Sequence, residues 1–435
     1  YGDMDGNWTD GDGDGVFDPN TLPSDVELEV GRVDLSGLPG KLTSNGPATF
    51  PGERELLRQY LNKNHGFRHN LVTAPRRALI GDRFGRYGDE AFAASGYRTF
   101  AAFFGATNIV KANADDGAAV TERWISMLGQ NPFLWAFGSG GGTYTSIRAL
   151  GTHPPYDSVV TTDLVSVDAK AIFTMMFGSL LCEWDAEDNI MRAVLATPNY
   201  GLACSWSGRP HLFYHHMGLG ETIGYGIRLS QNNNGLYQNQ VNRYLRGVHV
   251  ALMGDPTLRL HPVAPPLALT ATNGPDGVRL EWTPSDDAVE GYHVYRAALA
   301  AGPFARLTPS LTGETRFLDP SAPAGAQTYM VRTVKLEETV SGSYYNPSQG
   351  IFTTISNAPA VLKFTAWEWD SGGNVRLSWT SVPGLRYRVL SKASLAETQW
   401  TDRSGALTAD SSTTSWTDTA ASQARERFYI VSTTD

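Results

Sequence analysis

The sequence predicts a multidomain protein in which a three-layer α/β domain is followed by two all-β sandwich domains. The chain has 435 residues, which is more than one ordinary domain holds. Segments with the pattern of strands alternate with segments with the pattern of helices up to residue 261, as in α/β domains. After a proline-rich linker the helical periodicity disappears, and short alternating segments with many turn residues follow. We therefore expect an α/β domain at 1–261, a linker and first sandwich at 262–357, and a second sandwich at 358–435.

The elements of the α/β domain follow from local hydrophobic patterns. Period-two alternation or short apolar runs predict strands at 26–33, 77–82, 133–142, 171–179 and 202–206. Helical spacing of apolar residues predicts helices at 53–64, 90–104, 117–128 and 187–196, and the segment 247–260 closes the domain. The runs at 133–142 and 171–179 are apolar and end in glycine and small polar residues, as buried parallel strands do. The carboxyl ends of such strands are where α/β sheets place their sites.

An internal repeat supports two similar sandwiches. Val278–Thr283 and Val375–Thr380 share the pattern Val-Arg-Leu-x-Trp-Thr, and each is followed by another alternating segment. The repeat makes Trp282 equivalent to Trp379, with Tyr295 and Tyr387 downstream, and aromatic residues so placed normally fill a sandwich core. We expect Tyr329 at a corner between strands. Exposed Trp400 and Trp416 would favour a carbohydrate platform, but core packing is the commoner role.

Composition excludes some classes of partner. The net charge is -9 and no Lys/Arg run stands out, so we expect no nucleic-acid partner. No apolar stretch has the length of a membrane span, so we expect none. The two cysteines, Cys182 and Cys204, fit either one disulfide in an exported protein or two buried thiols. The chain opens at Tyr1, inside an acidic loop, and we expect an upstream fragment of the same precursor as a partner.

The acidic opening predicts bound Ca²⁺. Asp10, Asp12, Asp14 and Asp18 occupy positions 1, 3, 5 and 9 of a loop with Gly15 at the sixth, the order that begins an EF-hand-type calcium loop. Position 12 is Thr21 rather than Glu, so the bidentate ligand would come from elsewhere, for example Asp25 or Glu27. A second, partial set consists of Asp3, Asp5 and Asn7. A solvated acidic turn is the alternative, but so many carboxylates repel one another without a cation.

The α/β region resembles the gingipain-like (C25) cysteine peptidases, relatives of caspases. The resemblance covers residues 1–261 and rests on the order of several segments: the strand at 29–33 with the helix after it, the glycine-ended strands, and Met253-Gly-Asp-Pro-Thr-Leu258. It implies an α/β caspase-like fold with an immunoglobulin-like domain after it. The segment 267–356 is similar to fibronectin type III.

The resemblance also implies where a catalytic pair would lie, and this chain departs from it. The family's histidine follows the first glycine-ended strand, where this chain has Ser139, and its cysteine follows the next strand, where this chain has Gly178 and Ser179. Cysteine peptidases need a thiolate, which a neighbouring imidazole usually generates. The substitutes that the sequence offers are Cys182 and His211. His211 and His215 are four residues apart and could alternatively form a metal or base site, although hydrogen-bonded histidines are commoner.

These observations favour a secreted or cell-surface structural or adhesive protein, stabilised by calcium, whose peptidase-like domain has lost its activity. Self-assembly or a surface partner would fit such a role. One alternative is an active extracellular cysteine endopeptidase that uses Cys182 with a relocated histidine. Another is a carbohydrate-binding surface protein, which only the aromatic content supports.

Overall fold

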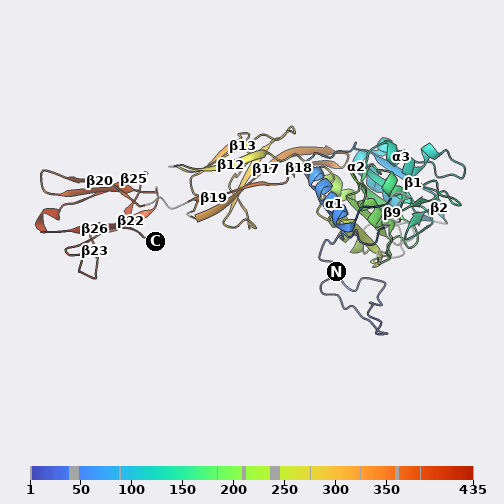
Figure 1. Ribbon diagram of the computed structural model, residues 1–435, viewed down its shortest axis with the longest axis horizontal. Coiled ribbons are helices and arrows are strands. Elements are labelled where there is room, and N and C mark those ends of the chain that lie inside the picture. The colour runs from blue at the N-terminus through green and yellow to red at the C-terminus, as the bar shows by residue number, and fades with distance from the viewer. Residues whose placement is uncertain are drawn as a thin grey trace. The chain divides into compact units, whose positions relative to one another are not determined.

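The computed structural model describes residues 2–38, 49–87, 90–183, 185–207, 212–235, 245–274, 276–323, 325–357, 362–382 and 384–434. It divides into two compact units (Figure 1). The first comprises Tyr1–Pro265, Asp287–Val289 and Val334–Gln349, and the second comprises Pro266–Asp286, Glu290–Thr333 and Gly350–Asp435. The first unit thus takes two short segments from the region predicted to form the first sandwich.

A six-stranded sheet forms the centre of the first unit. Its strands, in spatial order, are β11 (Val250–Gly254), β10 (Ala203–Ser207), β9 (Ala171–Phe177), β5 (Phe133–Ser139), β1 (Ala78–Asp82) and β4 (Ile109–Lys111). Neighbouring strands run parallel except β11, which is antiparallel to β10. Both β5 and β9 are buried along their whole length, as their apolar sequences predict.

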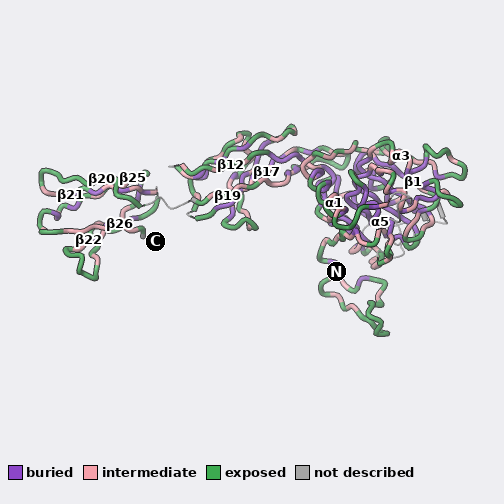
Figure 2. The backbone as a smooth tube through the Cα atoms, in the orientation of Figure 1, coloured by how far each residue is buried: buried purple, intermediate pink, exposed green. Residues whose placement is uncertain are grey.

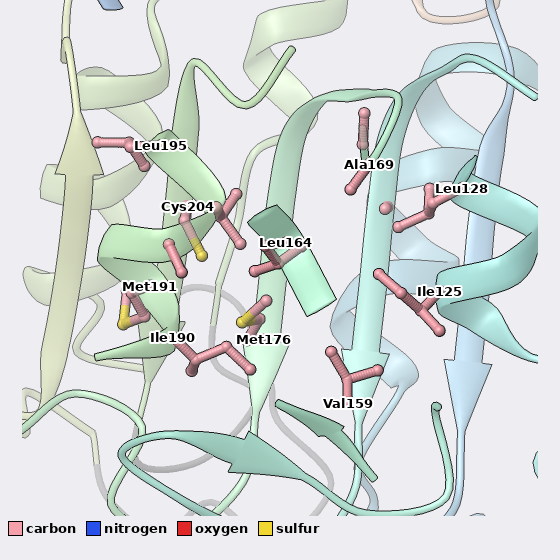
Figure 3. Packing of buried hydrophobic residues seen from close by; sticks show 14 of the residues in the cluster. Ile125, Leu128, Val159, Leu164, Ala169, Met176, Ile190, Met191, Leu195 and Cys204 are labelled. Carbon is pink, nitrogen blue, oxygen red and sulfur yellow. The ribbon is translucent and has the colours of Figure 1, made fainter. Parts of the chain in front are cut away.

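Helices cover both faces of this sheet. They are α1 (Glu53–Arg68), α2 (Ala94–Phe104), α3 (Trp124–Gln130), α4 (Asp163–Ser166), α5 (Ile190–Leu195) and α6 (Ile223–Gln231), with the short 3₁₀ helices η1 (Ala106–Asn108), η2 (Val120–Glu122) and η3 (His215–Leu219). In β1, Leu79 belongs to one buried cluster, whereas Ala78 and Ile80 belong to another. The first cluster includes α3 and α5 (Figure 3), and the second includes α2 and α6. The sheet is therefore the middle of three layers, as expected.

Several local predictions were wrong. Residues 26–33 do not form a strand, because the Glu27 and Leu28 amides donate to the Gly2 carbonyl instead, and only Arg32 bridges to Met253 of β11. The helix predicted at 90–104 starts at Ala94, after the short strand β3, and α6 was not predicted. The remaining short strands of the first unit are β2 (Arg86–Tyr87), β3 (Glu90–Ala91), β6 (Gly142–Thr143), β7 (Ser146–Ile147) and β8 (Val159–Val160).

A hairpin distant in sequence completes the first unit. It consists of the end of β17 (Gly325–Thr339) and β18 (Gly342–Pro347). The Thr339 hydroxyl donates to the Gly218 carbonyl at 2.6 Å, and the Ser341 hydroxyl donates to the Ala102 carbonyl at 2.7 Å. The Asn346 amide donates to the His261 carbonyl at 2.7 Å. These hydrogen bonds explain why Val334–Gln349 belongs to the first unit.

The first sandwich has two sheets. One contains β12 (Leu267–Gly274), β13 (Gly277–Thr283) and β16 (Arg316–Asp319), and the other contains β15 (Ala305–Arg306), β14 (Gly291–Ala297), β17, β18 and β19 (Ile351–Asn357). Trp282 is buried, as predicted, but the buried tyrosine of the next strand is Tyr292 rather than Tyr295. Tyr329 is buried and its hydroxyl donates to Asp319 at 2.8 Å.

The second sandwich repeats this plan in a shorter form. Its first sheet contains β20 (Phe364–Trp369), β21 (Val375–Thr380) and β25 (Thr413–Asp418). Its second contains β22 (Arg386–Lys392), β23 (Thr401–Asp402), β24 (Leu407–Thr408) and β26 (Phe428–Thr434), and η4 (Ala421–Gln423) precedes β26. Trp379 and Tyr387 are buried in its core, as predicted, and Figure 2 shows that core residues are sparser here than in the first unit. Trp400 and Trp416 are half-buried and form no exposed platform.

Candidate functional site

The carboxyl ends of β1, β5 and β9 lie side by side. Ser139 at the end of β5 is opposite Asp82 of β1 on one side and Phe177 of β9 on the other. Gly178 and Ser179 follow β9 directly. The two strand ends that the sequence predicted to form a site are therefore neighbours in the sheet.

The side chains at these strand ends form a closed and mostly apolar arrangement. Ser139 is fully buried, and its hydroxyl has no hydrogen bond of acceptable geometry within the described part of the chain. Burial raises the pKa of Asp82, against the opposing effects of the Gly85 amide and the nearby Ser139 hydroxyl. The rings of Phe84, Phe92 and Phe177 pack together, with the Phe92 and Phe177 centroids 4.7 Å apart.

Close backbone contacts explain why the residues that follow the strands are glycines. A Cβ atom added to Gly178 would lie 2.5 Å from the Gly140 carbonyl oxygen, which is backbone and cannot move aside. A Cβ atom added to Gly140 would lie 2.4 Å from the Arg148 carbonyl oxygen. Trp206 also donates its ring N–H to the Gly178 carbonyl at 2.9 Å. The chain is therefore packed too tightly at Gly178 to hold a cysteine side chain without a backbone shift, whereas Ser179 is exposed.

Both cysteines are free thiols, so the structure has the buried-thiol arrangement rather than the disulfide. Cys204 is fully buried in β10, and Cys182 is half-buried and packs against the same cluster. Burial, and then the negative charges of Asp185 and Glu183, raise the pKa of Cys182 to about 12. Burial also raises the pKa of Cys204. A thiol in such surroundings stays protonated near neutral pH and is a poor nucleophile.

The histidines that could act as a base were located next. His211 lies outside the described residues, so its pairing with Cys182 stays a prediction. The rings of His215 and His216 are 4.3 Å apart, and burial, together with the charge of His216, lowers the pKa of His215. His153 lies 2.6 Å from a carboxylate oxygen of Asp163.

The acidic N-terminal segment brings carboxylates together as two clusters. Oxygen atoms of Asp10, Asp12 and Asp14 lie within 4.8 Å of one another, which fits the predicted loop. The backbone fixes this loop, because Asp10 accepts from the Gly13 amide at 2.7 Å and the Gly15 amide at 3.0 Å. These hydrogen bonds lower the pKa of Asp10.

Asp18, also predicted as a ligand, accepts a hydrogen bond from the Gly11 amide at 2.5 Å. Its carboxylate therefore turns back onto the same loop.

The second cluster consists of Asp3, Asp5 and Glu27, again with oxygen atoms within 4.8 Å of one another. The Ser24 hydroxyl contacts both aspartates, at 2.6 Å from Asp3 and 2.8 Å from Asp5. Sequence reasoning proposed Asp25 or Glu27 as the missing ligand of the other loop. In the structure Asp25 pairs with Arg246, and Glu27 joins Asp3 and Asp5. No local pattern could reveal this, because it depends on the fold of residues 2–28.

A cavity of about 580 Å³ lies between this N-terminal segment and β11. Its lining is mostly apolar and includes Trp8, Leu22, Val26, Leu28, Ile227 and Leu252. The lining contains neither Ser139 nor Cys182. The cavity and the strand ends are therefore separate features of the first unit.

Among the described residues, none of the helices combines the length and the apolar character needed to cross a membrane. The chain matches no family model and no curated protein. It is similar to solved structures of the chicken interferon gamma receptor alpha chain (11% identity, 36% of this chain and 82% of that chain, TM-score 0.21) and of a two-domain fibronectin type III segment of chicken tenascin (14%, 39% and 99%, TM-score 0.18). A third is the FN1–FN3 segment of chicken CNTN1 (16%, 36% and 56%, TM-score 0.18). TM-scores this low carry no argument about the fold or the function of this chain.

Proposed function

We propose that this chain is a secreted or cell-surface structural or adhesive protein whose α/β domain resembles a gingipain-like peptidase without its catalytic pair. The observation that carries the proposal is the packing at the ends of β5 and β9. The buried Ser139 stands where the resemblance requires an imidazole, and where it requires a thiol the chain has Gly178, which is in close backbone contact, and the exposed Ser179. These residues supply neither an imidazole base nor a thiol, and a serine hydroxyl needs a neighbouring base before it can act as a nucleophile.

The nearest substitute nucleophile has the wrong electrostatics for catalysis. A peptidase cysteine has its pKa lowered by a neighbouring positive charge. Cys182 has its pKa raised, by burial and by the carboxylates of Asp185 and Glu183. Two all-β sandwiches after such a domain suit a role as spacer, docking module or assembly part.

Incubation of the purified chain with a mixed peptide library, with Ca²⁺ and a reducing agent, tests the proposal. We expect the same background hydrolysis for the wild type and for Cys182→Ala. Cleavage that disappears in Cys182→Ala would identify an active endopeptidase and contradict the proposal. His211→Ala would then show whether the predicted base takes part.

Calcium binding by the N-terminal segment is the second part of the proposal. Its support is the convergence of Asp10, Asp12 and Asp14 on one region, with a loop backbone already ordered around them. Carboxylate oxygens are the ligands that Ca²⁺ prefers, and three adjacent charges favour a divalent cation. The structural consequence would be a loop tied down in a calcium-rich, extracellular setting.

Isothermal titration of the calcium-free chain with CaCl₂ tests this part. We expect saturable binding that Asp10→Asn with Asp14→Asn abolishes, while Asp115→Asn with Asp116→Asn, which changes an exposed acidic pair elsewhere, leaves it intact. Equal titration curves for the two double variants would contradict a calcium site in this loop.

A further inference from the structure

The segment 148–158, which we call the cap segment, lies over the carboxyl ends of β1 and β5. Gly81 of β1 and Gly138 of β5 are directly opposite each other in the sheet. A Cβ atom added to Gly81 would lie 2.8 Å from Cδ2 of Leu150, and one added to Gly138 would lie 3.0 Å from Cδ1 of the same leucine. Leu150 is 0% exposed, so its side chain fills the space beside both glycines.

This space is at the part of the sheet where open α/β folds bind their ligands. The side chain of Trp124 lines it as well, because its Cδ1 atom would lie 2.9 Å from a Cβ atom at Gly81. The Ile125 amide of α3 donates to the Leu150 carbonyl at 3.0 Å and holds the leucine in place. The leucine of the chain itself therefore occupies a space that is lined by backbone and an aromatic ring.

A buried arginine fastens both ends of the cap segment. Arg123, which directly precedes α3, is 3% exposed. Its guanidinium donates to the Asp157 carboxylate at 2.7 Å and to the Ala149 carbonyl at 3.4 Å. A buried charge is stable only while it is paired, so the ion pair with Asp157 keeps the two ends of the segment together.

The two residues that Arg123 binds both have a strained backbone. The φ angle is 63° at Ala149 and 49° at Asp157, in the left-handed region that residues other than glycine rarely adopt. Such conformations persist only where surrounding contacts impose them, and they are concentrated at clamps and switch regions. The contacts of Arg123 therefore oppose a strain that opening of the segment would relieve.

The cap segment hydrogen-bonds to itself across its two arms. The Ala149 amide donates to the Tyr156 carbonyl at 2.9 Å, and His153 and Ser158 exchange two backbone hydrogen bonds of 2.9 and 3.1 Å. Residues 152–156, at its tip, are exposed. A segment that is closed on itself and fastened at its ends can open as one unit while the sheet stays folded.

We propose that the segment 148–158 is a cap that shuts the ends of β1 and β5 against ligands, and that it opens as one unit when the pair of Arg123 and Asp157 breaks. Leu150 then leaves its place and the backbone of the two strand ends becomes accessible, and the strain at Ala149 favours this opening. The inference concerns access to the strand ends, and it depends neither on the loss of peptidase activity nor on calcium.

Hydrogen exchange of the full chain, followed by mass spectrometry of peptides that cover 148–158, tests the proposal. We expect these amides to exchange faster than those of β5 in the wild type, and at least about tenfold faster again in Asp157→Asn. Asparagine keeps the size of the side chain and tolerates a left-handed backbone, but it lacks the charge that binds Arg123. Asp116→Asn removes the exposed partner of Arg83 in the same unit and should leave the exchange unchanged.

Ala149→Gly tests the strain with the opposite sign. Glycine adopts a φ of 63° without a steric penalty, so the closed cap is favoured and exchange of 148–158 should slow several-fold. Equal exchange in Asp157→Asn and the wild type, or exchange of the segment only together with β5 in every variant, would overturn the proposal. Faster exchange in Ala149→Gly would show that strain does not favour opening and would overturn that part of it.

A thiol at position 150 tests whether the leucine leaves its place. The side chain in Leu150→Cys should react with iodoacetamide only while the cap is open, and addition of Asp157→Asn should raise the rate at least about tenfold. Leu79→Cys, at another residue that is 0% exposed, should stay unlabelled with or without Asp157→Asn. A labelling rate at position 150 that Asp157→Asn does not change would contradict the cap.

Discussion

Two regions differ in how their predicted site residues are arranged. The sequence predicted a peptidase-like site at the ends of β5 and β9 and a calcium site in the acidic N-terminal segment. At the strand ends, Ser139 and Gly178 are buried and the space is filled by backbone and aromatic rings. In the N-terminal segment, exposed carboxylates of Asp10, Asp12 and Asp14 gather on a hydrogen-bonded loop. The first region contributes to stability by packing, and the second is the segment for which we propose calcium binding.

The largest effect is expected from placing a thiol at Gly178, the buried one of the two positions where the resemblance places the cysteine. Gly178→Cys puts a Cβ atom 2.5 Å from the Gly140 carbonyl oxygen, so the backbone has to shift. We expect a loss of about 3 kcal/mol in the free energy of unfolding, measured by urea denaturation. Ser179→Cys, at the exposed neighbouring position, should change stability by less than about 0.5 kcal/mol. If the two variants are equally stable, the strand ends are not closed by packing.

Removal of Ca²⁺ by a chelator should destabilise the N-terminal segment, whereas the strand ends depend on packing and not on a cation. At a Ca²⁺ concentration about 100 times the Kd, binding adds about 2.7 kcal/mol to the free energy of unfolding of the part that it holds. We expect EDTA to lower the Tm in calorimetry and to make residues 2–25, which contain Trp8 and Phe17, sensitive to chymotrypsin-like and acid-specific proteases. Asp10→Asn with Asp14→Asn should show the low Tm with or without Ca²⁺. A Tm indifferent to chelator in the wild type would indicate a plain acidic turn.

A smaller effect concerns Asp34, a carboxylate outside both regions. Asp34 pairs with Arg192 of α5 at 3.3 Å and accepts from the Ser36 hydroxyl at 2.6 Å. Burial opposes its charge, but these contacts and Arg32 outweigh burial and lower its pKa from 3.8 to about 2. Because the folded-state pKa is the lower one, the stabilisation is complete above pH 3.8 and is lost as the pH falls towards 2.

We expect this acid-labile contribution to be on the order of 1–2 kcal/mol in denaturation curves recorded across that pH range. Asp34→Asn should reduce the dependence on pH by this amount and lower stability at neutral pH, while other carboxylates with lowered pKa values, such as Asp255 and Asp418, keep their contributions. Asp402→Asn changes a carboxylate of the second sandwich that is more exposed, and its pH dependence should match that of the wild type. An acid transition unaffected by Asp34→Asn would contradict the role of this carboxylate.

Sequence patterns predicted the elements that depend mainly on residues close together in the chain. The burial of strands β5 and β9 could be predicted because both of their faces are apolar. The burial of Trp282 and Trp379 could be predicted because the internal repeat aligns them. Helix α6 was missed because its glycines weaken the helical pattern. They are needed for close packing, since a Cβ atom at Gly226 would lie 2.4 Å from the ring of Tyr214.

The features that sequence reasoning missed depend on contacts distant along the chain. Glu27 joins Asp3 and Asp5 only because the Gly2 carbonyl holds residues 27 and 28 in place of a strand. The hairpin at 334–349 joins the first unit through side-chain hydrogen bonds to Gly218 and Ala102, more than one hundred residues away. No local periodicity encodes such pairings.

The most direct test of the account is the pH dependence of Cys182 alkylation by iodoacetamide, followed by mass spectrometry. Burial and nearby carboxylates raise the pKa of this thiol to about 12, and Cys204 is inaccessible. We predict slow labelling at pH 7 and a rate that climbs about tenfold per pH unit without a plateau up to about pH 10. A plateau with a midpoint below about pH 7, lost in Cys182→Ala, would reveal an activated thiolate and contradict the account.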